Sequence, residues 1–123
     1  STVSEWRGTI GRGFGIQIDG AGLNLGDRIR LLEPRSSCGS ASSFEMHPSV
    51  VPRTAPYGGP NESSATSETW FGVTVLTVGV YKVCWCSGVV NACEGGQDFY
   101  YVAGFVVVAG ELRTVVGTGS EAA

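Results

Sequence analysis

Four cysteines are the residues whose chemistry is most evident in this sequence. Three of them, Cys84, Cys86 and Cys93, lie close together, and Cys38 stands far upstream. An even number of cysteines in a chain rich in turn-forming residues is typical of disulfides made in an oxidising compartment. Zinc is the alternative, but the spacing C-x-C-x6-C differs from the C-x2-C of common zinc sites. The pattern therefore favours two disulfides and no metal site.

The expected strand geometry limits how these cysteines can pair. Cys84 and Cys86 lie two residues apart on one face of an alternating segment, which separates them by roughly 7 Å. A regular strand therefore keeps them from bonding to each other. Two pairings remain open: Cys86–Cys93 with Cys38–Cys84, or Cys84–Cys93 with Cys38–Cys86. The first is favoured, because Cys93 returns from the loop just beyond Cys86.

No catalytic constellation is evident. The single histidine, His47, stands next to a proline in a polar segment, and no nucleophile signature such as G-x-S-x-G occurs. Asp19 and Asp27 stand near glycine turns, where a carboxylate can bind calcium but more often forms an Asx turn. The glycine-rich residues 11–15 do not match the G-x-G-x-x-G of a phosphate loop. We therefore expect a protein that is not an enzyme and has no cofactor.

Composition favours a single all-β domain. The chain has 123 residues, of which 42% are hydrophobic, and its 19 glycines and 5 prolines accompany many valines. The net charge of −3 comes with scattered cations, which argues against a nucleic-acid partner. No apolar run approaches the roughly 20 residues that span a bilayer. Because the chain begins at Ser1, we expect a processed product or a piece of a longer polypeptide.

Alternation of apolar and polar residues predicts the strands. In residues 28–32, Ile29 and Leu31 share a face, and Arg28 and Arg30 are expected on a solvated one. In residues 99–109, we expect a bulge or bend at Gly104. The other predicted strands are residues 14–19, residues 70–75 with Phe71, Val73 and Val75 on one face, and residues 79–86 with Tyr81, Val83 and Trp85 opposite Lys82, Cys84 and Cys86.

Residues 34–69 differ in kind from the rest of the chain. They are rich in Ser, Thr and Gly and contain every proline, so we expect an extended excursion over the surface that builds no core. Asn61-Glu62-Ser63 is an N-glycosylation sequon, and the hydroxyl groups and prolines suit further sugars. A bare flexible loop is the alternative. The candidate glycosylation sites are Asn61, Ser63, Ser64, Thr66, Pro48, Pro52, Pro56 and Pro60.

Three motifs resemble those of a known family. They are F-x-I-x-I-x-G-x-G-L-x-x-G-D-x-I in residues 14–29, G-x-Y-x-V-C-W-C in residues 79–86, and F-V-V-V-A-G in residues 105–110. Together they resemble immunoglobulin-like, TIG-like repeats in secreted and surface proteins of protists, including alveolates and algae. Gly79-x-Tyr81-x-Val83 is similar to the tyrosine corner that opens strand F of such sandwiches. The resemblance implies an immunoglobulin-like β-sandwich over residues 9–110, with an extracellular structural or adhesive role.

The leading functional hypothesis is a structural subunit or repeat of an extracellular or cell-surface filament or coat. Residues 1–8 are either an assembly arm donated to a neighbour or the first strand of their own sandwich, and residues 111–123 are a tail or linker. Head-to-tail self-association would then use exposed strand edges and terminal apolar residues. The candidate assembly residues are Val3, Trp6, Leu112 and Val115.

A carbohydrate-binding or adhesion module is the alternative function. It requires aromatic side chains exposed in a row, so that sugar rings can stack on them. The competing interpretation, which we favour, places Trp70, Trp85 and one of Tyr100 and Tyr101 in the core. The aromatic candidates for sugar binding are Trp6, Tyr57, Trp70, Tyr100 and Tyr101.

Overall fold

The computed structural model describes residues 4–40, 47–51 and 60–110. Within these ranges the chain forms eight strands and one short 3-10 helix, and no helix there has the length and apolar character needed to cross a membrane. The elements are β1 (Ser4–Thr9), β2 (Phe14–Asp19), β3 (Arg28–Leu32), β4 (Val50–Val51), β5 (Glu62–Ser63), β6 (Ser67–Val75), β7 (Gly79–Cys86), η2 (Gly96–Asp98) and β8 (Tyr101–Ala109).

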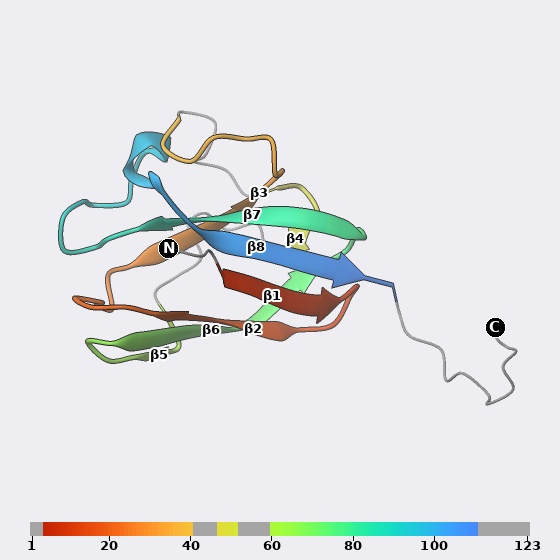
Figure 1. Cartoon of the computed structure of the whole chain (residues 1–123), viewed down its shortest axis with the longest axis horizontal. Coiled ribbons are helices and arrows are strands. Elements are labelled where there is room, and N and C mark those ends of the chain that lie inside the picture. Colours follow the sequence, from red (N-terminus) through yellow and green to blue (C-terminus); the bar gives the residue numbers. More distant parts are fainter. Residues whose placement is uncertain (1–3, 41–46, 52–59, 111–123) are drawn as a thin grey trace, which may run out of the picture.

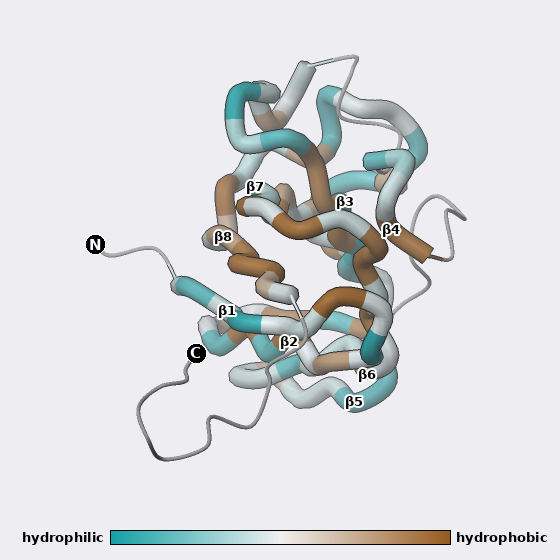
Figure 2. The backbone as a smooth tube through the Cα atoms, turned by 90° about the vertical axis from the view of Figure 1, so that its right-hand side faces the viewer, coloured by the Kyte–Doolittle hydropathy of each residue, from teal (hydrophilic) through white to brown (hydrophobic). Residues whose placement is uncertain are grey.

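The strands form two sheets that pack face to face (Figures 1 and 2). One sheet has the order β1-β8-β7-β3, and the other has the order β2-β6-β4, with β5 also paired to β6. All pairs are antiparallel except β1 with β8, which run in the same direction. The predicted all-β architecture with two disulfides is thus confirmed.

The main core lies between the two sheets. The longer strands contribute inward-facing residues to it, as expected for sheets with one face against the core, whereas both residues of β5 are exposed. The buried members are Ile16, Ile29, Leu31, Val50, Trp70, Val73, Val75, Tyr81, Val83, Val106 and Val108.

Strand β7 is covered on both faces. Tyr81 and Val83 face the main core, whereas Cys84 and Cys86 point to the opposite side. There they form a second buried cluster with Leu32, Cys93 and Phe99. The alternation predicted for this strand is therefore correct, and loops cover its outer face. Phe99 was expected to begin the last strand but instead follows η2 and fills this cluster.

Arg30 does not lie on a solvated face, contrary to the expectation from the sequence. Its side chain is fully buried, with the guanidinium carbon 4.4 Å from the centre of the Phe99 ring and Nη1 donating a hydrogen bond to the Ile29 carbonyl. Burial lowers the pKa of Arg30 to about 10. Alternation within β3 correctly separates Arg30 from Ile29 and Leu31, but residues 87–100 cover the outer face of the sheet on which Arg30 lies.

Strand β6 also differs from the predicted alternation. Gly72 adopts a positive φ of 74°, and the pairing with β2 shifts between Phe14 and Ile16. This bulge adds one residue between the two inward-facing positions Trp70 and Val73. Phe71, expected beside Val73, is therefore 54% exposed on the outside.

The proline-rich region is not wholly a surface excursion. Its described parts supply β4, β5 and the first residues of β6, and Val50 is fully buried in the main core. The expectation that residues 34–69 build no core is therefore wrong at this position. Cys38 lies at the start of the region and is tied to β7, while residues 41–46 and 52–59 lie outside the described ranges.

The first strand belongs to the sheet of its own chain. β1 pairs with β8 from Ser4 opposite Gly104 to Thr9 opposite Ala109. Trp6 packs against the main core, and its Nε1 donates a 3.1 Å hydrogen bond to the Gln17 carbonyl in the other sheet. Of the two interpretations of residues 1–8, this pairing favours the intramolecular strand.

Gly104 allows β1 to approach β8. The pairing of β7 with β8 shifts between Val83 and Cys84, opposite Gly104, so the expected irregularity is present. A Cβ atom placed on Gly104 would overlap the Ser4 carbonyl oxygen and lie 2.8 Å from the Trp6 ring. A side chain at this position is therefore incompatible with the observed position of β1.

We predict that Gly104→Ala lowers the free energy of unfolding by about 1–3 kcal/mol, the usual cost of overpacking a close contact. Gly110→Ala is the control, since a Cβ atom there meets nothing within 4 Å. Urea unfolding followed by tryptophan fluorescence measures both. Equal stability of the two variants would contradict the close packing of β1 on β8.

Candidate functional site

Exposed apolar side chains gather at the two ends of the sandwich. We call the end at which β8 begins the entry end; it comprises residues 20–27, 64–66 and 87–101. We call the end at which β8 stops the exit end; it comprises residues 10–13, 49–51, 76–80 and 110. The entry end exposes Leu25, Val89, Val90, Tyr100 and Tyr101. The exit end exposes Val51, Leu76, Val78 and Val80, and Phe71 is the remaining large apolar residue exposed in the described ranges.

The turn between β6 and β7 holds two apolar side chains outward at the exit end. Leu76 and Val78 are 53% and 55% exposed. The Tyr81 hydroxyl donates a 2.6 Å hydrogen bond to the Thr77 carbonyl between them. The Leu76 amide donates to the Ser49 carbonyl at 2.9 Å, and the Ser49 and Thr77 hydroxyl groups are 2.7 Å apart. The turn is therefore fastened to both β4 and β7.

A pocket of about 200 Å³ lies at the entry end. Its apolar walls come from both sheets, because Ile18 belongs to β2 while Trp85 and Tyr101 belong to β7 and β8. The two aromatic rings meet edge to face, with centroids 6.0 Å apart. Asp19 stands at the polar side and accepts a hydrogen bond from Gln17. The remaining lining residues are Gly20, Ala21 and Leu23.

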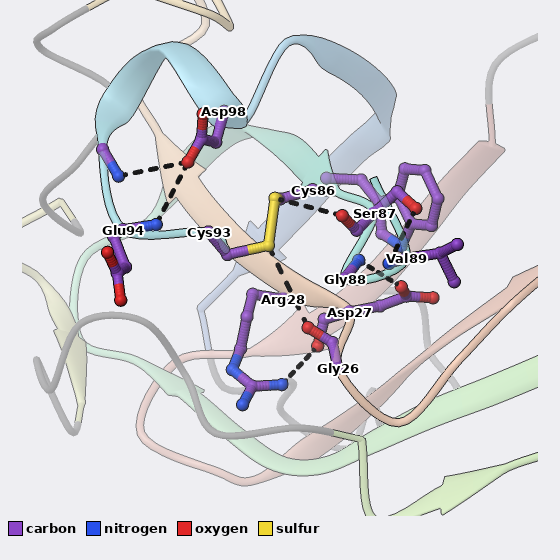
Figure 3. The surroundings of a disulfide bond; sticks show 12 residues. Gly26, Asp27, Arg28, Cys86, Ser87, Gly88, Val89, Cys93, Glu94 and Asp98 are labelled. Carbon is purple, nitrogen blue, oxygen red and sulfur yellow. Dashed lines mark hydrogen bonds between the residues drawn. A yellow bond between two sulfur atoms is a disulfide. The ribbon is translucent and has the colours of Figure 1, made fainter. Parts of the chain in front are cut away.

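Asp27 joins two loops beneath the entry end (Figure 3). Its Oδ2 accepts a hydrogen bond from the Asn24 amide at 2.9 Å, and its Oδ1 accepts one from the Gly88 amide at 2.8 Å. A Cβ atom on Gly88 would overlap the backbone of Gly26, so the two loops are in direct backbone contact. Neither bond is the contact of an Asx turn, in which a side chain accepts from the amide two residues on; in this turn that contact is made by Asn24, whose Oδ1 accepts from the Gly26 amide at 2.7 Å. Asp27 instead has a fully buried side chain that connects the two loops.

Glu68 is a second buried carboxyl group beside Asp27. Trp85 Nε1 donates a 3.0 Å hydrogen bond to Glu68 Oε2. Burial raises the pKa of Glu68 to about 7; the bond from Trp85 opposes this shift, and both a hydrogen bond and charge repulsion from Asp27 add to it. The raised pKa means that Glu68 is protonated in a substantial fraction of molecules near neutral pH.

The cysteines pair as Cys38–Cys84 and Cys86–Cys93, the favoured of the two pairings left open by the sequence. Both disulfides lie on the outer face of β7. One ties down the segment that follows β3, and the other closes the loop 87–92. Two such bonds are typical of proteins that fold in an oxidising environment.

The sequon lies at an edge of the sheet formed by β2, β4, β5 and β6, which is the smaller sheet because two of its strands have only two residues. Asn61 is exposed, and its Oδ1 accepts a 2.6 Å hydrogen bond from the Phe71 amide, which leaves the side-chain nitrogen for other contacts. Ser63, Ser64 and Thr66 are exposed nearby, whereas Pro60 is buried. Pro48 is also exposed, and Pro52 and Pro56 lie outside the described residues.

The aromatic candidates for sugar binding do not form an exposed row in the described part of the chain. Trp70 is buried in the main core, and Trp6 is half-buried against it. Tyr100 and Tyr101 are each 54% exposed, and Tyr57 lies outside the described residues. Of the assembly candidates, Trp6 packs within its own chain, and Val3, Leu112 and Val115 lie outside the described residues.

The remaining polar candidates have structural contacts. His47 meets Tyr81 edge to face at 5.0 Å, and its Nδ1 accepts a hydrogen bond from the Ser49 amide. Among residues 4–40, 47–51 and 60–110, no three His, Cys, Asp or Glu side chains come together as metal ligands.

The sequence analysis did not identify Glu68 as a buried carboxyl group, nor the exposed apolar residues at the two ends of the sandwich. Glu68 stands two residues before the buried Trp70, and this spacing signals an inward-facing position on the same strand. No comparable local signal marks Leu76 and Val78 as exposed, because apolar residues around a turn are equally compatible with burial.

Comparison with known proteins finds no matching family model, no matching curated protein and no matching solved structure.

We predict that stability falls as pH rises through about 7. The folded pKa of Glu68, about 7, exceeds its ordinary value of 4.5, so its contribution is complete below pH 4.5, is lost progressively as the pH rises from 4.5 through about 7, and does not change further above that. Glu68→Gln should flatten this dependence, whereas Glu62→Gln at the exposed edge should not. Urea titrations at pH 5, 7 and 9 measure the effect, and identical profiles for wild type and Glu68→Gln would refute it.

Proposed function

We propose that this chain is a non-enzymatic structural module of an extracellular filament or surface coat, in which modules are joined in a line. The observation that carries the proposal is the parallel pairing of β1 with β8. Both strands point the same way in Figure 1: β1 begins opposite Gly104 and runs toward the end at which β8 stops, before Gly110. This geometry suits a linear array, whether the modules are covalent repeats or separate subunits.

We further propose that the sandwich is immunoglobulin-like. The order β8-β7-β3 corresponds to strands G, F and C, and the order β2-β6-β4 corresponds to B, E and D. The hydrogen bond from Tyr81 to the Thr77 carbonyl, four residues upstream, is the bond that defines a tyrosine corner. These features support the likeness to the TIG-like repeats of protist secreted and surface proteins. They depart from the usual pattern in β1, which pairs with β8 and not with β2.

An extracellular location is supported by the two disulfides and by the exposed sequon. Sugar at Asn61 would stand beside β5 and β6, at an edge of the smaller sheet. A glycan there would hinder sideways pairing of this edge with another sheet, a common hazard for edge strands. Contacts between modules would then be directed to the ends.

A carbohydrate-binding or adhesion module remains the second candidate. The entry-end pocket favours it, because Trp85 and Tyr101 border a polar group, Asp19, in the combination that sugar binding uses. It is weaker than the structural proposal because the exposed aromatic row that it requires is not found in the described residues.

Negative-stain imaging of the native material tests the structural role. We expect fibres or a regular coat with a repeat along the long axis of the sandwich. Dispersed particles with the size of one module would contradict the proposal.

We predict an N-linked glycan at Asn61 in the native protein. Enzymatic release of N-linked glycan should lower the intact mass of the wild type and of a Ser64→Ala variant, but not of Ser63→Ala, since only Ser63 completes the sequon. All variants are compared after expression in the native host. An unchanged mass for the wild type would exclude the modification.

A further inference from the structure

The distribution of exposed apolar residues is uneven along the sandwich. Nearly all of the large ones found in the described ranges belong to the two ends, and Phe71 on the outer face of the smaller sheet is the exception. Solvated apolar groups that collect in one place commonly mark a contact surface. Both ends have a pocket, but they differ in what surrounds it. The exit end projects the turn between β6 and β7, and its pocket of about 300 Å³ lies where β1 and β8 stop, whereas the entry-end pocket is walled by the rings of Trp85 and Tyr101.

The exit-end turn is held in a single arrangement. Its backbone is bonded to Tyr81 and Ser49, so Leu76 and Val78 cannot turn inward without breaking these hydrogen bonds. A surface that is already ordered loses little conformational entropy when it binds. The turn is therefore a preorganised apolar projection.

The entry-end pocket has a matching size and chemistry. Ile18, Trp85 and Tyr101 line it, and cavities of about 150 Å³ already admit a molecule as large as benzene. A pocket of about 200 Å³ thus has room for an aliphatic side chain. The exposed apolar residues around it, Leu25, Val89, Val90 and Tyr100, extend the contact beyond the pocket.

We propose that the Leu76–Val78 turn of one copy docks into the entry-end pocket of the next copy. The inference rests on the proposed function, because a linear array brings the exit end of one module to the entry end of its neighbour. Charge favours the same partner, since Arg12 lies at the exit end and Asp19 borders the pocket. The contact joins two different surfaces, so it propagates along a line and does not close as a twofold dimer.

A mixing experiment with two variants tests this contact. Leu76→Asp places a charge on the projection, and Ala21→Glu places one in the pocket; both positions are exposed, so neither change disturbs the core. Phe71→Asp, also at an exposed apolar position, is the control away from both ends. Sedimentation velocity is measured up to about 1 mM chain, the effective concentration that a short linker provides.

We expect the wild type and Phe71→Asp to form chains of increasing size with concentration. Leu76→Asp and Ala21→Glu should each associate at least about tenfold more weakly on their own. An equimolar mixture of the two should form dimers and nothing larger, because one intact projection then meets one intact pocket. A wild type that remains monomeric, or a mixture that behaves as its components do, would overturn the inference. Fibres in the native material together with either result would leave the structural role standing and refute only this contact.

Discussion

Strand β7 is buried on both faces, and the arrangement of the chain depends on this constraint. Its inward residues Tyr81 and Val83 meet the opposite sheet, which is ordinary for a sandwich. Its outward residues Cys84 and Cys86 are buried as well, although residues 4–40, 47–51 and 60–110 contain no third sheet to cover them. Loops provide the cover, and each is attached through a disulfide to the strand that it covers. Cross-links hold such irregular segments in place where they cannot build a core alone.

The same cover explains the buried polar groups. Once residues 87–100 lie over the larger sheet, Arg30 is withdrawn from water and stacks on Phe99. Asp27 is buried too, but two backbone amides satisfy its oxygens. Buried polar groups are costly unless they are hydrogen-bonded, and Glu68 meets this requirement only in part, because Oε2 accepts from Trp85 while Oε1 has no hydrogen-bond partner in the described part of the chain. Beneath the entry end, buried polar contacts therefore connect the two sheets, as in the hydrogen bond from Trp85 of β7 to Glu68 of β6.

The first and last described strands, β1 and β8, run in the same direction. An arrangement in which the first and last strands run in opposite directions would bring chain entry and exit together at one end. Here both strands run along the long axis of the sandwich toward the same end. The hydrogen bond from Tyr81 to the Thr77 carbonyl fastens the turn at one end, and Asp27 joins two loops at the other.

The sequence alone determined the strand content, the positions of most strands and the favoured cysteine pairing, because these depend on residue alternation and on distances within one strand. It also marked Gly104 and Tyr81, whose roles follow from local backbone demands. Tertiary structure decided which outward faces were covered, so Arg30 and Phe99 became buried and Phe71 became exposed. It also decided that Val50 joins the core and that Glu68 meets Asp27. These outcomes could not be predicted, since alternation specifies that a residue faces one side of a strand but not what distant part of the chain lies there.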